Sequence, residues 1–140
     1  MKPSRAVKVF FYGSFIRRDV QEKAGLVNSS AEVARLNGFD IHVCPHAALS
    51  ESNEHCVYGL LADVTHEQLD ALYSAPGVGE FLPRAVTVET RDGKTSPSLC
   101  FIPPTYENLP ADRDYLEKLI SAGREYGFPA WYLAKLASLP

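Results

Sequence analysis

Soft metal ligands occur at alternate positions in the segment His42-x-Cys44-x-His46, and a His-Cys pair follows at residues 55–56. In a regular strand the first three side chains would share one face, an arrangement that zinc could use. However, structural zinc sites usually contain closely spaced cysteine pairs, and Pro45 is expected to disrupt the strand. We therefore expect no bound metal and interpret these residues as loop or partly buried side chains.

Covalent catalysis has no clear signature in the chain. Cys100 lies within the apolar run of residues 99–102, and we interpret it as an inert core thiol rather than a nucleophile. The Gly-x-Ser-x-Gly pattern of a nucleophile elbow is absent from the sequence. Residues 77–79, Gly-Val-Gly, lack the further glycine and the lysine of a phosphate-binding loop.

The composition is that of a chain able to form its own core. Of its 140 residues, 46% are hydrophobic and 11% are aromatic. This size predicts a single domain over residues 1–140 that needs no disulfide or metal to fold. The three cysteines are odd in number and widely spaced, which favours reduced thiols and a cytoplasmic location.

The charge pattern limits the kinds of partner. The net charge is −3, and the Lys and Arg residues are scattered rather than clustered, so no nucleic-acid partner is expected. No apolar run approaches the roughly 20 residues needed to cross a bilayer, so no membrane partner is expected either. No pattern in the sequence predicts an oligomeric state.

Five segments are expected to form strands, because they are rich in β-branched and aromatic residues or alternate in polarity. They are residues 6–12, 31–43, 57–64, 84–90 and 98–102. Gly38 is expected to mark a bulge, and Asp92-Gly93 a hairpin turn between the last two strands. The polar stretch of residues 45–55 is predicted to be a loop.

Capping signals predict the helices. Asp19 is a candidate cap for a short helix ending near residue 25, and residues 65–68, Thr-His-Glu-Gln, form a capping box. A longer helix is expected over residues 112–126, and a last short helix is expected to begin at Pro129. Strands in succession, with helices between some of them and at the end, predict an α+β or mixed-sheet domain rather than a regular βαβ series.

Several segments, in this order along the chain, resemble the γ-glutamylcyclotransferase-like (AIG2-like) family. They are residues 10–15 (Phe-Phe-Tyr-Gly-Ser-Phe), 57–61 (Val-Tyr-Gly-Leu-Leu), 69–72 (Leu-Asp-Ala-Leu), 81–88 (Phe-Leu-Pro-Arg-Ala-Val-Thr-Val) and 115–129, which end in Gly-Phe-Pro. The resemblance extends over most of the chain. It implies an α+β fold built on a small mixed β-barrel with flanking helices and a cavity at one barrel end, with neither a cofactor nor a metal.

In that family, the loop after the first strand holds the γ-glutamyl group of the substrate, largely through backbone N–H groups. The resemblance therefore implies that Tyr12, Gly13, Ser14 and Phe15 bind a small γ-glutamyl or amino-acid-like ligand. A glycine allows a tight turn whose successive amides form a nest for a carboxylate, whereas an ordinary strand-to-loop turn is the alternative. Phe81 is assigned to the same pocket, with a purely structural place in the core as its alternative.

Active members of the family carry a glutamate in a Glu-Gly pair just after the short helix, and this carboxylate moves a proton from the substrate's α-amino group to the departing amine. If Gly77 matches the family glycine, Pro76 occupies the place of that glutamate. Proline cannot accept a proton, and general acid–base catalysis contributes about 10²–10⁴-fold. Glu80 is the nearby substitute, with a solvated surface position as the alternative, while Glu67 and Asp70 are expected on an exposed helix face.

Two functional hypotheses follow. In the first, the protein is a γ-glutamylcyclotransferase-like enzyme that converts a γ-glutamyl amine or peptide to 5-oxoproline and a free amine, with Glu80 as catalytic acid and base. In the second, the protein is a non-catalytic binding module that keeps the pocket for a small amino-acid-like ligand or a protein partner. The proline at position 76 favours the second chemically, and the resemblance as a whole favours the first as the broad description.

Overall fold

The computed structural model describes residues 6–23, 31–73 and 80–140. The strands are β1 (Ala6–Phe11), β2 (Glu32–Val43), β3 (Ala47–Thr65), β4 (Leu82–Thr90) and β5 (Thr95–Ile102). The helices are α1 (Arg18–Lys23), α2 (His66–Tyr73), α3 (Arg113–Tyr126) and α4 (Ala130–Ala137), with one 3₁₀ turn, η1 (Ser14–Ile16). None of the helices in these three stretches combines the length and the apolar character needed to span a membrane.

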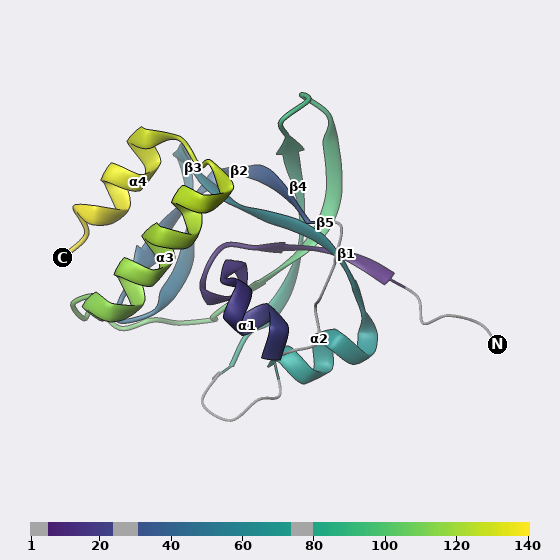
Figure 1. The fold of residues 1–140 in the computed structure, drawn as a ribbon, viewed down its shortest axis with the longest axis horizontal. Coiled ribbons are helices and arrows are strands. Elements are labelled where there is room, and N and C mark those ends of the chain that lie inside the picture. The colour runs from purple at the N-terminus through teal and green to yellow at the C-terminus, as the bar shows by residue number, and fades with distance from the viewer. Residues whose placement is uncertain (1–5, 24–30, 74–79) are drawn as a thin grey trace.

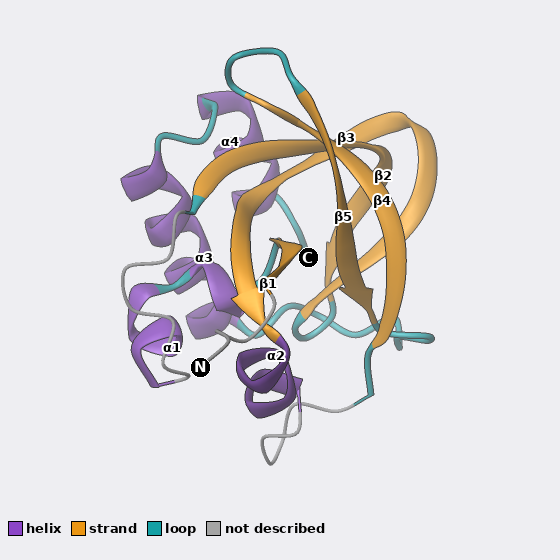
Figure 2. Cartoon of the chain, turned by 90° about the vertical axis from the view of Figure 1, so that its right-hand side faces the viewer, coloured by secondary structure: helices purple, strands orange, loops and turns teal. Residues whose placement is uncertain are grey.

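The strands close into a barrel in the order β1-β3-β2-β4-β5 (Figure 2). The pairing of β1 with β5 is parallel, and the other neighbours pair antiparallel. The predicted α+β class with a mixed barrel is therefore confirmed. The β2–β4 pairing is short, because only Ala34 with Thr90 and Arg35 with Glu89 are in register.

The prediction of a loop over residues 45–55 is wrong. After the turn of residues 44–46, β3 runs without interruption from Ala47 to Thr65 and pairs with β2 from its first residue. Residues 50–55 are all polar, and most of them are exposed, so they lack the hydrophobic alternation that normally signals a strand. Residues 47–51 and 56–61 form a strand by pairing with β2, and residues 52–55 span the register shift opposite Gly38. The bulge at Gly38 is confirmed, since the register shifts between Asn37 and Phe39 and Gly38 has a φ of 88°.

The core is built around β1, whose last three residues are almost completely buried. Gly59 on β3 lies against this strand so closely that a Cβ atom there would be 2.1 Å from the carbonyl oxygen of Phe11. Only a residue without a side chain allows the two backbones to approach in this way. The close contact fixes the end of β1, from which the next loop departs.

The helices cover one flank and one end of the barrel. In Figures 1 and 2, α3 and α4 lie together against the flank, and α2 lies at the end. The predicted capping box is confirmed: the Gln68 N–H donates to the Thr65 hydroxyl at 3.1 Å, and the Thr65 N–H donates to the Gln68 side chain at 2.9 Å. Helix α3 is capped by Asp112 and ends at Gly127, which has a φ of 77°.

Helix α1 differs from the prediction at its start. Asp19 is not the residue before the helix, because α1 begins at Arg18 and Asp19 lies in its first turn, where it pairs with Arg17 at 2.5 Å. The predicted end near residue 25 lies outside the described residues.

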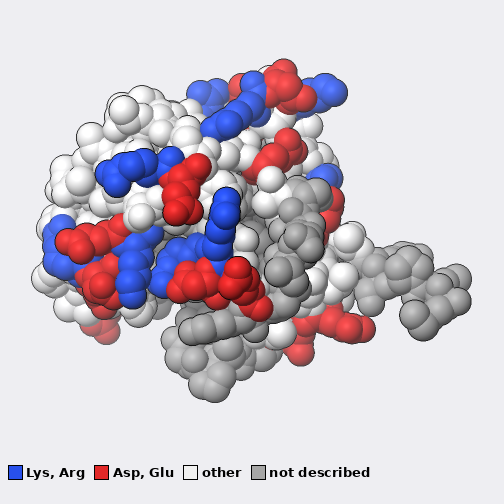
Figure 3. Space-filling model, in the orientation of Figure 1, with Lys and Arg blue, Asp and Glu red and all other residues white. Residues whose placement is uncertain are grey.

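On the face shown in Figure 3, basic and acidic groups lie side by side rather than in stripes of one sign.

Candidate functional site

The loop that follows β1 turns sharply at Gly13. The turn continues into η1, where the N–H of Ile16 donates to the carbonyl of Gly13 at 3.0 Å. A Cβ at Gly13 would lie 3.0 Å from the Cβ of Ala47 and 3.0 Å from the Tyr115 hydroxyl, so the glycine makes room for both neighbours. For the N–H groups of Gly13 and Phe15, the described part of the chain supplies no acceptor.

The hydroxyl of Tyr115 holds this loop in place. It accepts one hydrogen bond from the N–H of Ser14 and another from the N–H of Ala47, each at 3.2 Å. One phenol therefore joins the loop, the start of β3 and the first turn of α3. Burial raises the pKa of Tyr115, so the phenol is neutral at physiological pH and acts through its hydrogen bonds.

A small cavity of about 40 Å³ lies beside the loop. All of the residues predicted to bind substrate line it, from Tyr12 to Phe15 and Phe81. The remaining walls come from the five elements β1, β3, α2, β5 and α3, and consist of Phe11, Ala47, Tyr73, Phe101 and Tyr115. The structure thus brings Phe81 next to a loop that is more than sixty positions earlier in the chain. Its role in substrate binding stays a prediction.

The cavity wall is aromatic and rigid. The Tyr73 ring stacks on Phe101 with centroids 4.3 Å apart and meets the edge of Phe15 at 5.2 Å. The Tyr12 hydroxyl donates to the carbonyl of Phe101 at 2.8 Å, which ties the loop to β5. Burial raises the pKa values of Tyr12 and Tyr73 well above the ordinary range of a phenol. These phenols can orient a ligand, but they are not bases at neutral pH.

The described residues lining the cavity include no carboxylate and no histidine. Glu80 is exposed and lines a neighbouring open groove of about 450 Å³. The groove and the cavity share two wall residues, Ala47 and Phe81. Glu80 is therefore beside the cavity rather than part of its described wall, and its catalytic role stays a prediction. Pro76 lies outside the described residues.

A family model described as γ-glutamyl cyclotransferase, AIG2-like, matches residues 9–123, which include the loop, the cavity walls and most of α3. The chain belongs to this family. A curated γ-glutamylcyclotransferase from Bos taurus is 29% identical over 147 aligned residues, which cover 93% of this chain and 77% of the relative.

Solved structures agree with the fold of this family member. A γ-glutamyl cyclotransferase structure superposes with a TM-score of 0.85 at 22% identity, covering 96% of this chain and 88% of the other. An uncharacterised protein from Homo sapiens gives a TM-score of 0.80 at 25% identity, covering 97% and 89%. The barrel and its flanking helices are therefore those of the γ-glutamylcyclotransferase-like fold.

Sequence reasoning missed several residues that build the cavity of this γ-glutamylcyclotransferase-like protein. Tyr115 lies in the helix expected over residues 112–126, with no role predicted for its hydroxyl, and Ala47 lies in the stretch predicted to be a loop. Tyr115 lies 101 positions after Ser14, and no local pattern indicates that its hydroxyl would reach that amide. The available signal is the tyrosine itself, since a tyrosine that becomes buried usually needs a hydrogen-bond partner.

The other residues considered for chemistry have structural partners. His42 stacks on Tyr106 with centroids 5.1 Å apart and bonds to Ser50, and His46 packs against Tyr115 at 4.6 Å. Among the described residues, no group of three or more potential metal ligands comes together.

Cys100 is a core thiol, as expected. Its side chain is fully buried, and burial raises its pKa to about 12, so the reactive thiolate is disfavoured.

Proposed function

We propose that this protein binds the γ-glutamyl group of a small amine or peptide at the loop of residues 12–15 and cyclises it to 5-oxoproline, releasing the free amine. The observation that carries the proposal is the convergence of this loop and Phe81 on one cavity, with the loop held by Tyr115. Membership of the γ-glutamylcyclotransferase, AIG2-like family supports the reaction class.

The sizes of the two hollows suggest how the ligand divides between them. A volume of about 40 Å³ accommodates a group the size of a carboxylate but not a whole γ-glutamyl moiety. One end of the ligand would occupy the cavity near the N–H groups of Gly13 and Phe15, and the remainder would lie in the groove beyond Phe81. Backbone N–H groups in a turn are suited to an anion.

The chemistry requires one proton carrier. The nitrogen of the α-amino group attacks the γ-carbonyl carbon, and the bond from that carbon to the leaving nitrogen breaks. The proton lost by the attacking nitrogen passes to a carboxylate and then to the departing amine, so that the carboxylate ends in its original state. Glu80 lines the groove through which the amine would depart, and we assign it this role.

A non-catalytic binding module is the second candidate. It is favoured by the absence of a carboxylate among the described cavity walls and by the exposure of Glu80. In that case the cavity and groove would bind an amino-acid-like ligand without turnover.

The test separates the two candidates. The protein is incubated with a panel of γ-glutamyl amino acids and amines, 5-oxoproline is quantified, and binding of each compound is measured by calorimetry. Glu80→Gln is compared with Glu107→Gln, because Glu107 is an exposed carboxylate lining the same groove.

Product that disappears in Glu80→Gln and persists in Glu107→Gln supports the enzyme. Binding without product supports the module. Neither binding nor product with any panel member contradicts both candidates.

A further inference from the structure

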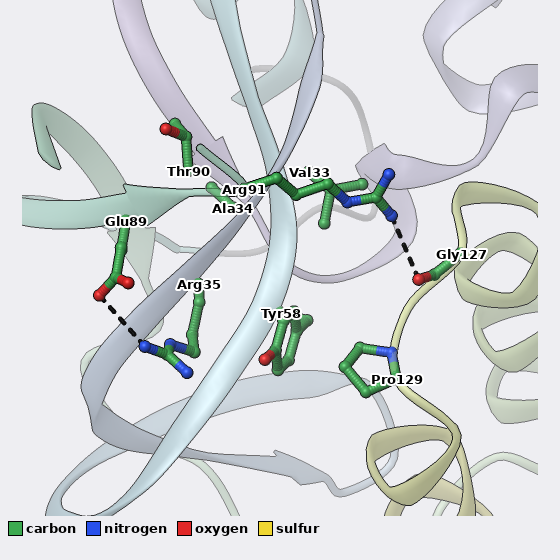
Figure 4. A pocket seen from close by; sticks show the side chains of 9 residues that line it. All are labelled: Val33, Ala34, Arg35, Tyr58, Glu89, Thr90, Arg91, Gly127 and Pro129. Carbon is green, nitrogen blue, oxygen red and sulfur yellow. Dashed lines mark hydrogen bonds and ion pairs between the residues drawn. The ribbon is translucent and has the colours of Figure 1, made fainter. Parts of the chain in front are cut away.

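A second pocket, of about 280 Å³, lies across the seam where β2 meets β4 (Figure 4). The four residues paired at that seam, Ala34, Arg35, Glu89 and Thr90, all line it. None of its lining residues belongs to the cavity at the Tyr12–Phe15 loop. The two hollows are therefore separate.

One wall of this pocket carries an arginine that is already held in place. Arg91 extends from the β4–β5 turn toward the end of α3 (Figure 4). Its Nη2 atom donates to the carbonyl of Tyr126 at 2.8 Å and to that of Gly127 at 3.2 Å. The residues that the structure describes provide no acceptor for its Nε and Nη1 groups. Those donors can bind an anion without a change in the position of the side chain.

The opposite wall pairs a second arginine with a glutamate. Arg35 donates to Glu89 at 3.1 Å, and hydrogen bonds with Glu89 and Tyr58 raise the pKa of its guanidinium. With Arg91, the lining contains two guanidinium groups and one carboxylate. The pocket is therefore locally cationic in a chain whose net charge is −3, so an anion is the favoured ligand.

The rest of the pocket lining is partly apolar. Val33 and Pro129 contribute apolar side chains, and Tyr58 contributes an aromatic ring. The Tyr58 ring packs against Phe128 at 6.0 Å and Tyr132 at 5.2 Å, so neighbouring rings fix its orientation. Preformed pockets that combine apolar walls with a few placed polar groups are typical of small-molecule sites.

We infer that this seam pocket is a second binding site, for a small organic carboxylate whose charged group lies at Arg91 and whose flat body lies against Tyr58 and Pro129. The inference does not depend on the proposed cyclotransferase activity.

The chain carries its own reporter for this site. Trp131 is its one tryptophan, and its ring lies 5.8 Å from that of Tyr58 in an edge-on contact. Fluorescence of Trp131 is titrated with benzoate, benzamide and benzylammonium at constant ionic strength. These probes share one shape and differ in charge. Saturable binding of benzoate at least about tenfold tighter than that of the other two is expected, because a charged hydrogen bond is worth about one decade or more in affinity.

Two variants predict opposite effects on benzoate affinity. Arg91→Gln should weaken binding by about tenfold, because it removes the charge that faces the carboxylate. Glu89→Gln should strengthen binding several-fold, because it removes the negative charge and leaves both arginines. Arg113→Gln is the matched control, since Arg113 is another exposed arginine whose Nη2 donates to a backbone carbonyl, that of Leu139, outside the pocket. It should leave the affinity unchanged.

The outcomes decide the inference. Three results together support the site: preferential binding of benzoate, opposite changes of benzoate affinity in the two variants, and changes in the NMR chemical shifts of the Ala34 and Gly127 amides when benzoate is added. Equal affinity for all three probes, no saturable binding of benzoate, or the same change in Glu89→Gln as in Arg91→Gln overturns it. If Arg91→Gln unfolds, as judged by circular dichroism, the direction of the change in benzoate affinity in Glu89→Gln decides alone whether the site is supported.

Discussion

The hydroxyl of Tyr115 lies 3.2 Å from the backbone nitrogen of Ser14 and accepts its hydrogen bond. A helix near the C-terminal end of the chain thereby positions the loop that follows the first strand. Together with the Tyr12 hydroxyl, which ties the loop to β5, this contact holds the loop from two sides.

Replacement of Tyr115 by phenylalanine should loosen the loop while keeping the ring. The N–H groups of Ser14 and Ala47 would lose their acceptor in a partly buried position. We expect the free energy of unfolding to fall by about 1–3 kcal/mol, which is the usual cost of an unsatisfied buried polar group. Denaturant titration measures the change.

Tyr126→Phe is the control for this substitution, because Tyr126 lies on the same helix and its ring is also partly buried. Its effect on the unfolding free energy should stay within about 0.5 kcal/mol. Equal losses in the two variants would show that the Tyr115 hydroxyl does not stabilise the loop.

Gly59→Ala should be strongly destabilising. Its Cβ would lie 2.1 Å from the Phe11 carbonyl oxygen, so β1 and β3 would have to separate. We expect a loss of about 3 kcal/mol in the free energy of unfolding, at the upper end for overpacking. Gly93→Ala provides the comparison: at a φ of 82° with nothing within 4 Å of the new Cβ, it should cost only about 1 kcal/mol of backbone strain. A similar loss in both would argue against close β1–β3 contact.

Stability should fall in alkaline solution in a way that depends on Cys100. Burial raises its pKa from the ordinary 9.0 to about 12, so the folded state retains a proton that the unfolded chain releases. The contribution is fully present below pH 9.0 and is lost as the pH rises toward 12. Its slope is at most about 1.4 kcal/mol per pH unit. Unfolding measured across this range should show a smaller slope for Cys100→Ala; an unchanged slope would contradict the assignment.

Local chemistry explains which parts of the fold were predictable. The Thr65–Gln68 capping box and the Gly38 bulge each depend on neighbouring residues, and each forms as expected. The end of α3 at Gly127 is equally local. The first half of β3 is not predictable locally, because residues 50–55 are all polar. Residues 47–51 become a strand by pairing with β2, and residues 52–55 span the register shift opposite Gly38.

The cavity was predictable only in part, because segments far apart in the chain form much of its wall. The Tyr12–Phe15 loop and Phe81 were assigned to one pocket through the family resemblance, and they do line one cavity. Ala47 and Tyr115 complete the wall through contacts between distant segments, which no sequence pattern indicates. Arg35 and Arg91 come together across the barrel seam in a similar way.

Backbone amide chemical shifts, followed by NMR while a γ-glutamyl compound is added, test the location of the proposed site most directly. Saturable shifts should appear at Ser14 and Phe15 and extend to Phe81, and they should weaken in Tyr115→Phe. Saturable shifts confined to other parts of the molecule, such as the seam pocket at Gly127, would contradict a γ-glutamyl site at this loop.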